Sequence, residues 1–440
     1  MNSDTDRQHW VNWFRQASPY INAHRDKTFV IALSGEALAH DNINNIVHDL
    51  ALLTSLGVQL VIVYGGRPQI DALLQQRGID CKFHQGLRIT TPEILGPVLS
   101  AYGMLRAELE AKLSMGVVNS PMYGAKIRVV SGNFVVAKPH GVNDGIDFGH
   151  TGRVRRIEAS AIEQQLKAEA IVLMPAQGYS MTGEAFNLGY ESLAAEVAKA
   201  LKAEKLIYLG ESPLRHTHDD SDLPQQTTLP ELKALLDDPS HQFSEGLARQ
   251  LAAAELACEA GVRRVHLLDY ARDGALLEEL FTRDGQGIMI SLEGYDQIRP
   301  AQVEDINGIM ELIQPLEDAG FLIRRSRERL ENELDYFLVD IRDNAIVGCV
   351  GLYPYPSVQS GELSCFAVHP DYRRQGRGDK LLQAVERKAK NLNYAKLYVL
   401  TTKTEHWFKE RGFEPVAPTS LPGEKVYNAD RNAKVLVKSI

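Results

Sequence analysis

The chain has 440 residues, of which 44% are hydrophobic and 24% charged, and it carries a formal net charge of −9. These values are usual for a soluble globular protein of two or three domains, and the negative charge disfavours nucleic-acid partners, whose phosphates need a positive face. The four cysteines are far apart and form no CxxC pair, which argues against a disulfide framework or a zinc site. Residues 52–64, the most apolar stretch, are too short and polar to cross a bilayer, and the N-terminus lacks the apolar core of a signal peptide, so we expect a cytoplasmic protein without membrane contacts.

Residues 1–25 are expected to form a helical arm, because Trp10, Trp13 and Phe14 follow near-helical spacing. Such an arm either packs on its own domain or reaches a neighbouring subunit. Both interpretations are compatible with the sequence.

Residues 26–292 alternate short apolar runs with helical patterns, which predicts an α/β sandwich with a mainly parallel central sheet. The apolar runs read TFVIAL, VQLVIVY, AIVLMP, KLIYL and RRVHLLD. Residues 126–139 are typical of a hairpin-like insertion. The polar stretch 211–228 predicts a loop, and although His216 to Asp222 include metal-ligand residue types, no strand or helix pre-organises them, so we expect no metal site.

The pattern restarts near Glu293, and residues 296–440 are expected to form a second α/β domain. A strand and a helix beginning near Asp305 precede two strands joined by the turn Asp343–Asn344. A further strand then enters a glycine-rich basic loop that opens a helix. A strand, a short helix and a final strand pair complete the domain.

The sharpest motif of the chain is this loop, Val368 to Gly378, which reads VHPDYRRQGRG. A pyrophosphate needs several backbone N–H donors aimed at one point together with the positive end of a helix dipole. Gly376 and Gly378 allow close backbone approach, and three arginines add positive charge: Arg373, Arg374 and Arg377. Taken alone, the segment could also be an ordinary basic turn before a helix.

The pattern R-x-x-G-x-G after a strand ending V-x-P resembles the acetyl-CoA loop of the GNAT acetyltransferases. The IRPA-x-x-x-D start and the WFKERGF segment extend the resemblance over residues 296–440. It implies that the end of the strand offers backbone groups to pantetheine, and that amides from residues 374–379 hold the pyrophosphate. The implied acetyl-CoA residues are Phe366, Ala367, Val368, Arg373, Arg374, Gly376, Arg377, Gly378 and Asp379.

The proton chemistry of the predicted site is less clearly marked. Phe408 stands where many GNAT enzymes carry a tyrosine that protonates the leaving thiolate. Another group, such as Thr401 or Thr402, must therefore stabilise the thiolate or relay a proton to it. Both threonines could equally reflect β-propensity and strand capping. Glu362 is the candidate general base for an ammonium acceptor, and the alternative is a solvated or salt-bridged strand carboxylate.

Two further groups are candidates for the acceptor half of the site. Cys365 could carry a covalent acetyl group, although a strand cysteine usually serves packing. A dicarboxylate acceptor calls for guanidinium forks, and the candidates are Arg324 with Arg325, and Arg431 with Lys434. Each of these cations, taken alone, could be a solvated surface residue.

The first domain resembles the amino-acid kinase fold, especially acetylglutamate kinases, and its fusion to a GNAT domain resembles the bacterial N-acetylglutamate synthase family. The resemblance implies transfer of an acetyl group from acetyl-CoA, a cosubstrate rather than a permanent cofactor, to L-glutamate in the first step of arginine biosynthesis. It implies that Arg325, Cys365 and Arg431 bind glutamate, that Glu362 is the base and that Thr401 assists. A homohexamer is also implied.

The first domain is expected to be regulatory rather than a kinase. Ala32 replaces the lysine that such kinases carry after their first strand, and Gly210–Glu211 replaces their Thr-Asp. The resemblance implies feedback inhibition by L-arginine at a site with six candidate residues: Tyr20, His266, Asp269, Glu279, Gly285 and Gly287. Three alternatives are a decayed, non-catalytic arginine sensor, a protein lysine acetyltransferase and a working kinase.

Overall fold

The computed structural model describes residues 4–115, 122–211, 223–239, 243–282, 285–292, 296–342, 345–373, 376–423, 427 and 432–440. The chain divides into two compact units, Met1–Gly294 and Tyr295–Ile440, which are described separately. Among the described residues, no helix is both long and apolar enough to span a membrane, and no group of three or more His, Cys, Asp or Glu side chains could hold a metal ion. The predicted metal-like segment from His216 to Asp222 lies outside the described residues.

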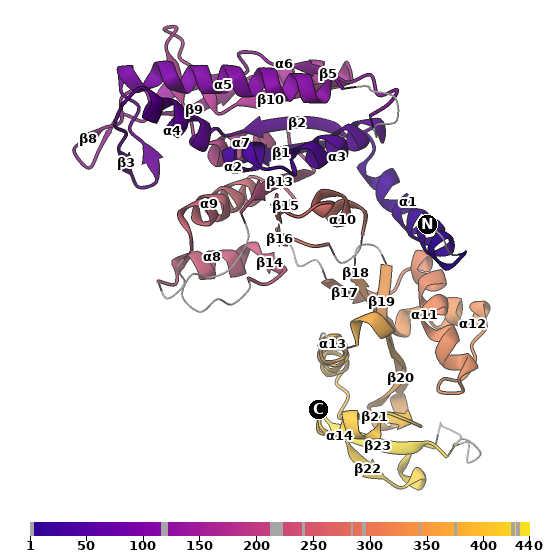
Figure 1. Cartoon of the computed structure of the whole chain (residues 1–440). Helices are drawn as coiled ribbons and strands as arrows, with labels where there is room; N and C mark the ends of the chain where they lie inside the picture. Colours follow the sequence, from indigo (N-terminus) through magenta and orange to yellow (C-terminus); the bar gives the residue numbers. More distant parts are fainter. Residues whose placement is uncertain are drawn as a thin grey trace. The chain divides into compact units, whose positions relative to one another are not determined.

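The first unit is built on an eight-stranded sheet in the order β14-β16-β15-β13-β1-β2-β10-β5 (Figure 1). All neighbouring strands are parallel except β15 and β16, which confirms the predicted mainly parallel sheet. The strands are β1 (Thr28–Leu33), β2 (Gln59–Tyr64), β5 (Arg128–Val130), β10 (Ala170–Pro175), β13 (Lys205–Gly210), β14 (Gln226–Thr228), β15 (Arg264–Asp269) and β16 (Ile288–Ser291).

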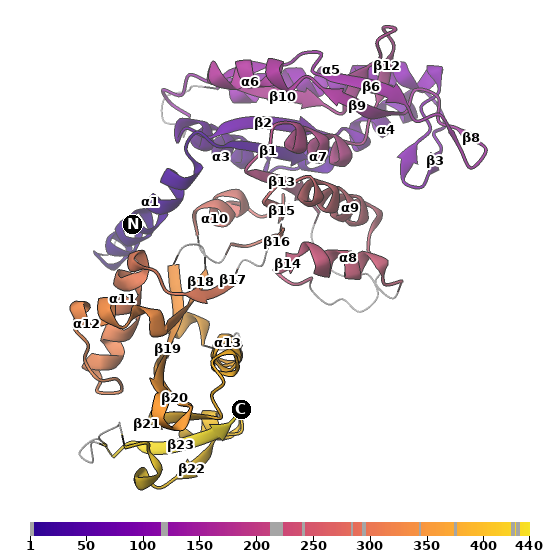
Figure 2. The ribbon, with the colours of Figure 1, turned by 180° about the vertical axis from the view of Figure 1, so that it is seen from behind.

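Helices cover both faces of this sheet, which explains why its strands read as continuous apolar runs (Figure 2). Along β1, Val30 and Ala32 pack into one core cluster and Phe29, Ile31 and Leu33 into the other. The first cluster includes α6 (Ala159–Lys167), α7 (Tyr190–Ala200), α8 (Leu229–Asp237) and α9 (Glu245–Glu259). The second includes α3 (Ile43–Ser55), α4 (Arg67–Gln76), α5 (Pro92–Leu113) and α10 (Ala275–Phe281), while α2 (Gly35–Ala39) follows β1.

The N-terminal arm is the helix α1 (Asp4–His24). Its C-terminal part packs on its own unit, because Ala17 is 2% exposed in the core and His24 Nε2 lies 2.8 Å from the carbonyl oxygen of Leu280. Farther toward the N-terminus, Trp13 and Phe14 are exposed. The arm therefore contacts its own domain and still presents aromatic surface.

A smaller sheet, β12-β11-β6-β9, and two short hairpins complete the first unit. The predicted hairpin at residues 126–139 is wrong: β5 joins the main sheet beside β10, whereas β6 joins the small sheet, because the two halves complete different cores. The remaining strands are β3 (Phe83–His84), β4 (Leu87–Arg88), β6 (Val135–Pro139), β7 (Val142–Asn143), β8 (Ile146–Asp147), β9 (Gly152–Ile157), β11 (Gln177–Tyr179) and β12 (Ala185–Asn187).

The second unit is a seven-stranded sheet in the order β17-β18-β19-β20-β21-β23-β22. Its only parallel pair among the described strands is β20 and β21. The strands are β17 (Asp296–Pro300), β18 (Phe337–Arg342), β19 (Ala345–Tyr355), β20 (Ser360–Val368), β21 (Lys396–Thr401), β22 (Glu414–Val416) and β23 (Lys434–Ser439). One face packs on α11 (Ile306–Asp318) and α12 (Arg327–Asn332), and the other on α13 (Arg377–Asn391) and α14 (Glu405–Lys409).

Candidate active site

The candidate site lies where β20 and β21 separate. Their parallel pairing runs from Ser360 opposite Lys396 to Leu363 opposite Val399, although β20 continues to Val368. Within that continuation Cys365 has a φ of +50°, and the register toward β19 shifts there in a β-bulge. Beyond Leu363, β20 no longer pairs with β21, and its residues 364–368 line a cavity of about 780 Å³. Backbone N–H and C=O groups on this side of β20 therefore face the cavity.

The cavity gathers most of the predicted site residues of the second domain. Its lining includes Arg325, Glu362, Cys365, Phe366, Ala367, Val368, Arg373, Gly376, Gly378, Asp379 and Thr401. Arg374 and Arg431 lie outside the described residues. Arg377 is the predicted residue that the described lining omits.

Glu362 is a buried carboxylate on the wall of this cavity, with 5% of its surface exposed. The hydroxyl of Tyr355, on the neighbouring strand β19, donates a hydrogen bond to Glu362 Oε2. A buried carboxylate is costly unless hydrogen bonds compensate its desolvation. The tyrosine therefore holds Glu362 in one orientation at the edge of the cavity.

Thr401 ends the neighbouring strand β21, also lines the cavity and is 8% exposed. Its Oγ1 accepts hydrogen bonds from the backbone N–H of Thr404 at 3.0 Å and of Lys403 at 3.3 Å, and lies 2.8 Å from Thr404 Oγ1. Phe408 is buried among the rings of Phe366 and Phe413. The turn that follows β21 therefore fixes the position of the Thr401 hydroxyl.

Cys365 has a protonated thiol at neutral pH. Burial raises the pKa of Cys365 to about 11, although the neighbouring Arg325 acts in the opposite direction. A nucleophilic cysteine needs thiolate character. The covalent alternative is therefore disfavoured, and the side chain packs in the core beside Cys349, whose Sγ lies 3.3 Å from the carbonyl oxygen of Cys365.

Arg325 places a guanidinium on the cavity wall. Its Nη2 donates to Ser364 Oγ at 2.8 Å and its Nη1 to the carbonyl oxygen of Ile323 at 3.0 Å, while Nε is buried without a hydrogen-bond partner among the described residues. Burial alone would lower the pKa of Arg325, but Cys365 and Tyr353 raise it above the ordinary value. The side chain is thus a charged donor with unused capacity, whereas Arg324 is exposed and pairs with Asp318.

Lys403 is a cavity residue that the sequence interpretation missed. Its Nζ lies 4.5 Å from the ring centroid of Phe321, and it has no ion-pair partner in the part of the chain that the structure describes. The signal in the sequence that could have indicated Lys403 is its position two residues after Thr401, in the loop that follows a strand with a predicted site residue. Lys403 and Arg325 both place a positive charge on the wall of the cavity.

The glycine-rich loop opens the fifteen-residue helix α13 with the left-handed residue Gly376, which has a φ of +69° and provides no side-chain cap. A Cβ on Gly378 would lie 2.9 Å from Trp407 Cζ2, so only glycine fits there. A helix N-terminus without a side-chain cap suits an anion, because its first backbone N–H groups and the helix dipole favour negative charge. Arg373 is exposed beside them and donates from Nε to the carbonyl oxygen of Val368 at 3.2 Å.

The predicted role of the Arg377 side chain is wrong. It is 1% exposed and pairs at 3.1 Å with Asp340, which is equally buried, and it lies over the ring of Tyr372. Its charge is neutralised inside the domain, so only its backbone can face a ligand. The carboxylate of Asp379 likewise pairs with Arg411, whose guanidinium lies 4.0 Å from the ring centroid of Trp407.

In the first unit, four predicted regulatory residues meet. His266 Nδ1 lies 2.6 Å from Glu279 Oε1, and Glu279 Oε2 accepts from the N–H groups of Gln286 and Gly287 at 2.7 and 2.9 Å. A Cβ on Gly285, whose φ is +59°, would lie 2.4 Å from Glu279 Oε2. Tyr20 lies on α1, and Asp269, at the end of β15, accepts from the N–H of Ala271 at 2.8 Å.

Protonation in this cluster is set by its buried neighbours. Burial would raise the pKa of Glu279, but the hydrogen bonds from His266 and the two amides lower it to about 2. Burial, and then the charge of Lys205, lower the pKa of His266. At neutral pH the cluster therefore contains an ionised carboxylate beside an uncharged imidazole.

The split strands and the uncapped helix α13 define the second unit as a GNAT acetyltransferase domain, and the first unit has the fold of an amino-acid kinase. Residues 306–413 match the Acetyltransferase (GNAT) family, and residues 27–269 match the Amino acid kinase family. The amino-acid acetyltransferase of Azotobacter vinelandii is 50% identical over 98% of this chain and 99% of its own length. That of Escherichia coli K12 is 48% identical over 98% of each chain.

The chain belongs to the amino-acid acetyltransferase family and is an acyltransferase. Among solved structures it is similar to N-acetylglutamate synthase from Neisseria gonorrhoeae in complex with coenzyme A and L-arginine. The two are 36% identical, the TM-score is 0.87, and the match covers 98% of this chain and 99% of the other. These comparisons confirm the fold class and family that the sequence motifs predict.

Proposed function

We propose that the chain transfers the acetyl group of acetyl-CoA to the amino group of L-glutamate, producing N-acetyl-L-glutamate and CoA in the first step of arginine biosynthesis. The observation that carries the proposal is the presence of buried Glu362 and partly unsatisfied Arg325 on the wall of one cavity. A second structure of the Neisseria synthase, 36% identical with a TM-score of 0.62, contains coenzyme A and N-acetylglutamate and supports the choice of substrates.

Acetyl-CoA would use backbone groups for most of its binding. The separated edge of β20, including Phe366, Ala367 and Val368, offers N–H and C=O groups to the amides of the pantetheine arm. The N-terminal amides of α13 around Gly376 and Gly378 suit the pyrophosphate, and Arg373 adds an exposed positive charge. With acetyl-CoA bound in this way, the thioester would lie between the two strands.

L-Glutamate would be held by its carboxylates. Arg325 can donate to one carboxylate, because its Nε has no hydrogen-bond partner in the described part of the chain and its guanidinium stays charged. Lys403 is another cation of the lining, and Arg431 is assigned to the same task from the family resemblance. The bulged backbone at Cys365 adds main-chain groups beside Arg325.

The chemistry follows from these positions. Glu362 accepts a proton from the glutamate ammonium, directly or through water, because only the neutral amine is nucleophilic. The amine nitrogen then attacks the thioester carbonyl carbon and the C–N bond forms. The C–S bond breaks with the electron pair leaving on sulfur, and the nitrogen loses a second proton, which balances the protonation of the thiolate. The hydroxyl of Thr401, fixed by Thr404 and Lys403, stabilises the thiolate or relays a proton to it.

We further infer feedback inhibition by L-arginine at the cluster of Tyr20, His266, Asp269, Glu279, Gly285 and Gly287. The ionised Glu279 matches a guanidinium in charge, and the Neisseria synthase was crystallised with L-arginine. The exposed aromatic residues of α1 support an interface with a neighbouring subunit, and the family resemblance implies a homohexamer built through the kinase-like domains and this arm. Inhibition then requires two conformations that arginine binds unequally.

The test is thiol release from acetyl-CoA with L-glutamate as acceptor, with and without L-arginine. We expect glutamate-dependent release that arginine reduces, and a loss of roughly 10²- to 10⁴-fold in Glu362→Gln. Peptide substrates with free lysines serve as the alternative acceptor. Release with peptides but not with glutamate, on folded protein that binds acetyl-CoA, would overturn the substrate assignment.

A further inference from the structure

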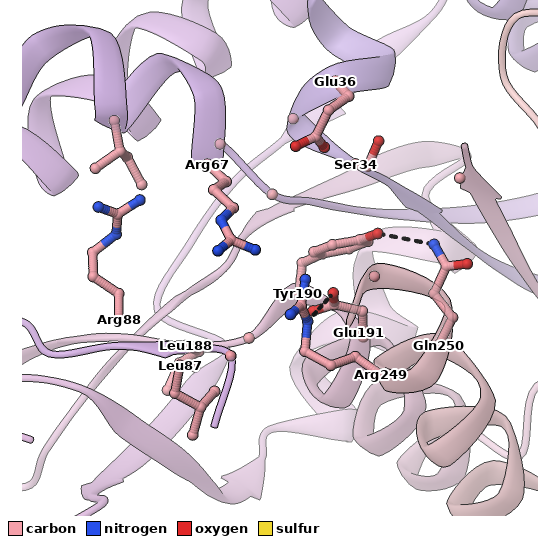
Figure 3. Close-up of a pocket in the computed structure, with 18 of the residues that line it drawn as sticks. Ser34, Glu36, Arg67, Leu87, Arg88, Leu188, Tyr190, Glu191, Arg249 and Gln250 are labelled. Carbon is pink, nitrogen blue, oxygen red and sulfur yellow. Dashed lines mark hydrogen bonds and ion pairs between the residues drawn. The ribbon is translucent and has the colours of Figure 1, made fainter. Parts of the chain in front are cut away.

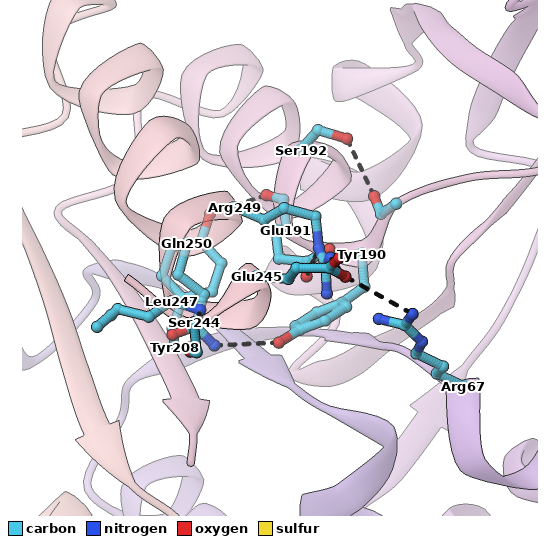
Figure 4. Close-up of polar contacts among 11 residues, drawn as sticks. Arg67, Tyr190, Glu191, Ser192, Tyr208, Ser244, Glu245, Leu247, Arg249 and Gln250 are labelled. Carbon is cyan, nitrogen blue, oxygen red and sulfur yellow. Dashed lines mark hydrogen bonds and ion pairs between the residues drawn. The ribbon is translucent and has the colours of Figure 1, made fainter. Parts of the chain in front are cut away.

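A partly enclosed guanidinium group is commonly neutralised by direct contact with a carboxylate, and Arg249 in the first domain shows this arrangement. Its Nε donates to the buried Glu191 at 2.9 Å, and the pair lies on the wall of a cavity (Figure 3). Its Nη1 lies 3.7 Å from a second carboxylate, that of Glu245 (Figure 4). Such contacts take up donors of the guanidinium and offset its charge, so less of both remains for a ligand.

Arg325, on the cavity wall of the second domain, is arranged differently. Within the described residues its guanidinium forms no ion pair with a carboxylate. Its Cζ lies 5.9 Å from the ring centroid of Tyr353, and the Tyr353 hydroxyl donates to Glu333 Oε2 at 2.6 Å. The carboxylate of Glu333 is thus linked to this guanidinium through a phenol ring rather than by direct contact.

The protonation of this pair fixes the direction of its hydrogen bond. Burial would raise the pKa of Glu333, but hydrogen bonds from Tyr353 and from Arg329, whose Nε lies 2.8 Å from Glu333 Oε1, lower it below the ordinary value. Burial and the hydrogen bond to Glu333 raise the pKa of Tyr353. At neutral pH a protonated phenol therefore donates to an ionised carboxylate.

Tyr353 stands next to the site without belonging to its surface. It pairs with Glu362 across β19 and β20, and opposite residues of an antiparallel pair point to the same face of the sheet. Neither Tyr353 nor Glu333 is among the described residues that line the cavity, whereas Arg325 is. An effect of the pair on a bound molecule must therefore pass through Arg325.

The physical effect of the phenol is to hold a cation while leaving it able to bind an anion. The face of an aromatic ring carries negative partial charge and attracts a guanidinium. A phenol that donates to an anion is polarised by that hydrogen bond, which makes its ring richer in electrons and strengthens the attraction. Arg325 therefore stays charged and in place without the direct carboxylate contacts that Arg249 makes, and its Nε keeps no partner among the described residues.

We propose that Tyr353 and Glu333 are positioning residues for the acceptor, which act through Arg325. Glu333 fixes the hydroxyl of Tyr353, and the Tyr353 ring holds the Arg325 guanidinium where it meets a carboxylate of the acceptor. Because this role rests on the proposed function, with L-glutamate as the acceptor, the pair should affect the binding of glutamate and leave the binding of acetyl-CoA unchanged.

The first test is steady-state kinetics of Tyr353→Phe on the full chain, with both substrates varied. The variant keeps the ring, which also packs on Tyr336 and Phe337 at centroid distances of 5.2 and 6.3 Å, so it should fold, and thermal unfolding checks this. We expect KM for L-glutamate to rise about tenfold, while kcat and KM for acetyl-CoA stay within about twofold. Glu333→Gln, whose amide oxygen can still accept from the phenol, should raise KM for glutamate by a smaller factor.

A double-mutant cycle then shows whether the effect passes through Arg325. In Arg325→Lys, which keeps a cation, adding Tyr353→Phe should raise KM for glutamate by less than about twofold more, because residues that act through one contact are not additive. Glu331→Gln, an exposed carboxylate paired with Arg327 at 2.9 Å, is the matched control and should leave KM unchanged.

Two kinds of failure can be told apart. An unchanged KM in Tyr353→Phe, the same factor in both backgrounds of the cycle, or an equal rise in Glu331→Gln would overturn the positioning role while the wild type still acetylates glutamate. A wild type that releases no thiol with L-glutamate would refute the proposed function itself, and the positioning role with it.

Discussion

The hydroxyl of Tyr355 donates a hydrogen bond to the carboxylate of Glu362 across the neighbouring strands β19 and β20, and both side chains are buried. We propose Glu362 as the general base, and such a group must be held in one orientation to meet its proton. The contact with Tyr355, which is not part of the cavity lining, restricts Glu362 in this way. The phenol ring is itself fixed by Tyr398, whose ring centroid lies 6.1 Å away.

Removing this hydroxyl should therefore slow catalysis without removing the base. We expect Tyr355→Phe to lower kcat about tenfold, the equivalent of one hydrogen bond to a charged group, while KM for acetyl-CoA stays constant. Steady-state kinetics with both substrates varied measure the effect. An unchanged kcat would show that Glu362 needs no support from β19.

Lys403 should matter for the acceptor and not for the donor. We expect Lys403→Gln to raise KM for L-glutamate by about tenfold, since it removes a charge-assisted contact worth roughly 1.4 kcal/mol or more. Lys396→Gln, at the exposed start of β21, is the matched control. A rise in KM for acetyl-CoA instead would place Lys403 on the donor side of the cavity.

Two arginines of the loop should give opposite phenotypes. Breaking the buried Arg377–Asp340 pair with Arg377→Met should cost roughly 3–5 kcal/mol of unfolding free energy, because it leaves an unpaired buried charge. Arg373→Met, at an exposed position, should leave stability within about 0.5 kcal/mol and raise KM for acetyl-CoA. Urea unfolding and initial rates separate the two, and similar stability losses would contradict this division.

Acid should destabilise the first domain through Glu279. Its pKa falls from an ordinary 4.5 to about 2 on folding, so its contribution is complete above pH 4.5 and is lost as the pH falls toward 2. The difference corresponds to roughly 3 kcal/mol. Folding also lowers the pKa of His266 from its ordinary value of 6.5. Below pH 6.5 the unfolded chain therefore binds a proton at His266 more readily than the folded chain, which lowers the unfolding free energy further.

The measurement is the unfolding free energy between pH 3 and 7 for the wild type and Glu279→Gln. We expect the wild type to lose stability toward low pH and the variant to show a flatter dependence. Glu278→Gln, an exposed neighbour paired with Arg272, is the control. Parallel pH profiles for wild type and Glu279→Gln would refute the assignment.

Cys365 should be dispensable as a nucleophile. Since burial raises the pKa of its thiol to about 11, we expect Cys365→Ala to retain activity within about tenfold, allowing for a small packing loss. Mass spectrometry of wild type mixed with acetyl-CoA should detect no acetylated Cys365. An acetyl adduct that forms and then decays when glutamate is added would restore the covalent pathway.

The sequence predicts local features well where the physical cause is local. Apolar runs such as TFVIAL mark strands buried on both faces, and the glycines at 376 and 378 mark the turn into α13. The direction of the Arg377 side chain depends on Asp340, 37 positions earlier, and no pattern near the loop indicates that pairing. The split of residues 126–139 between two sheets likewise depends on β10, far along the chain.

The separation of β20 from β21 has a consequence for how this enzyme class can change. Where recognition of the acyl donor relies on main-chain groups, most substitutions at positions 364–368 leave the donors and acceptors in place. The side chains of the same segment, among them Ser364 beneath Arg325, remain available to shape the acceptor. Substitutions in β20 can therefore change which amine the enzyme accepts while binding of the acyl donor is retained.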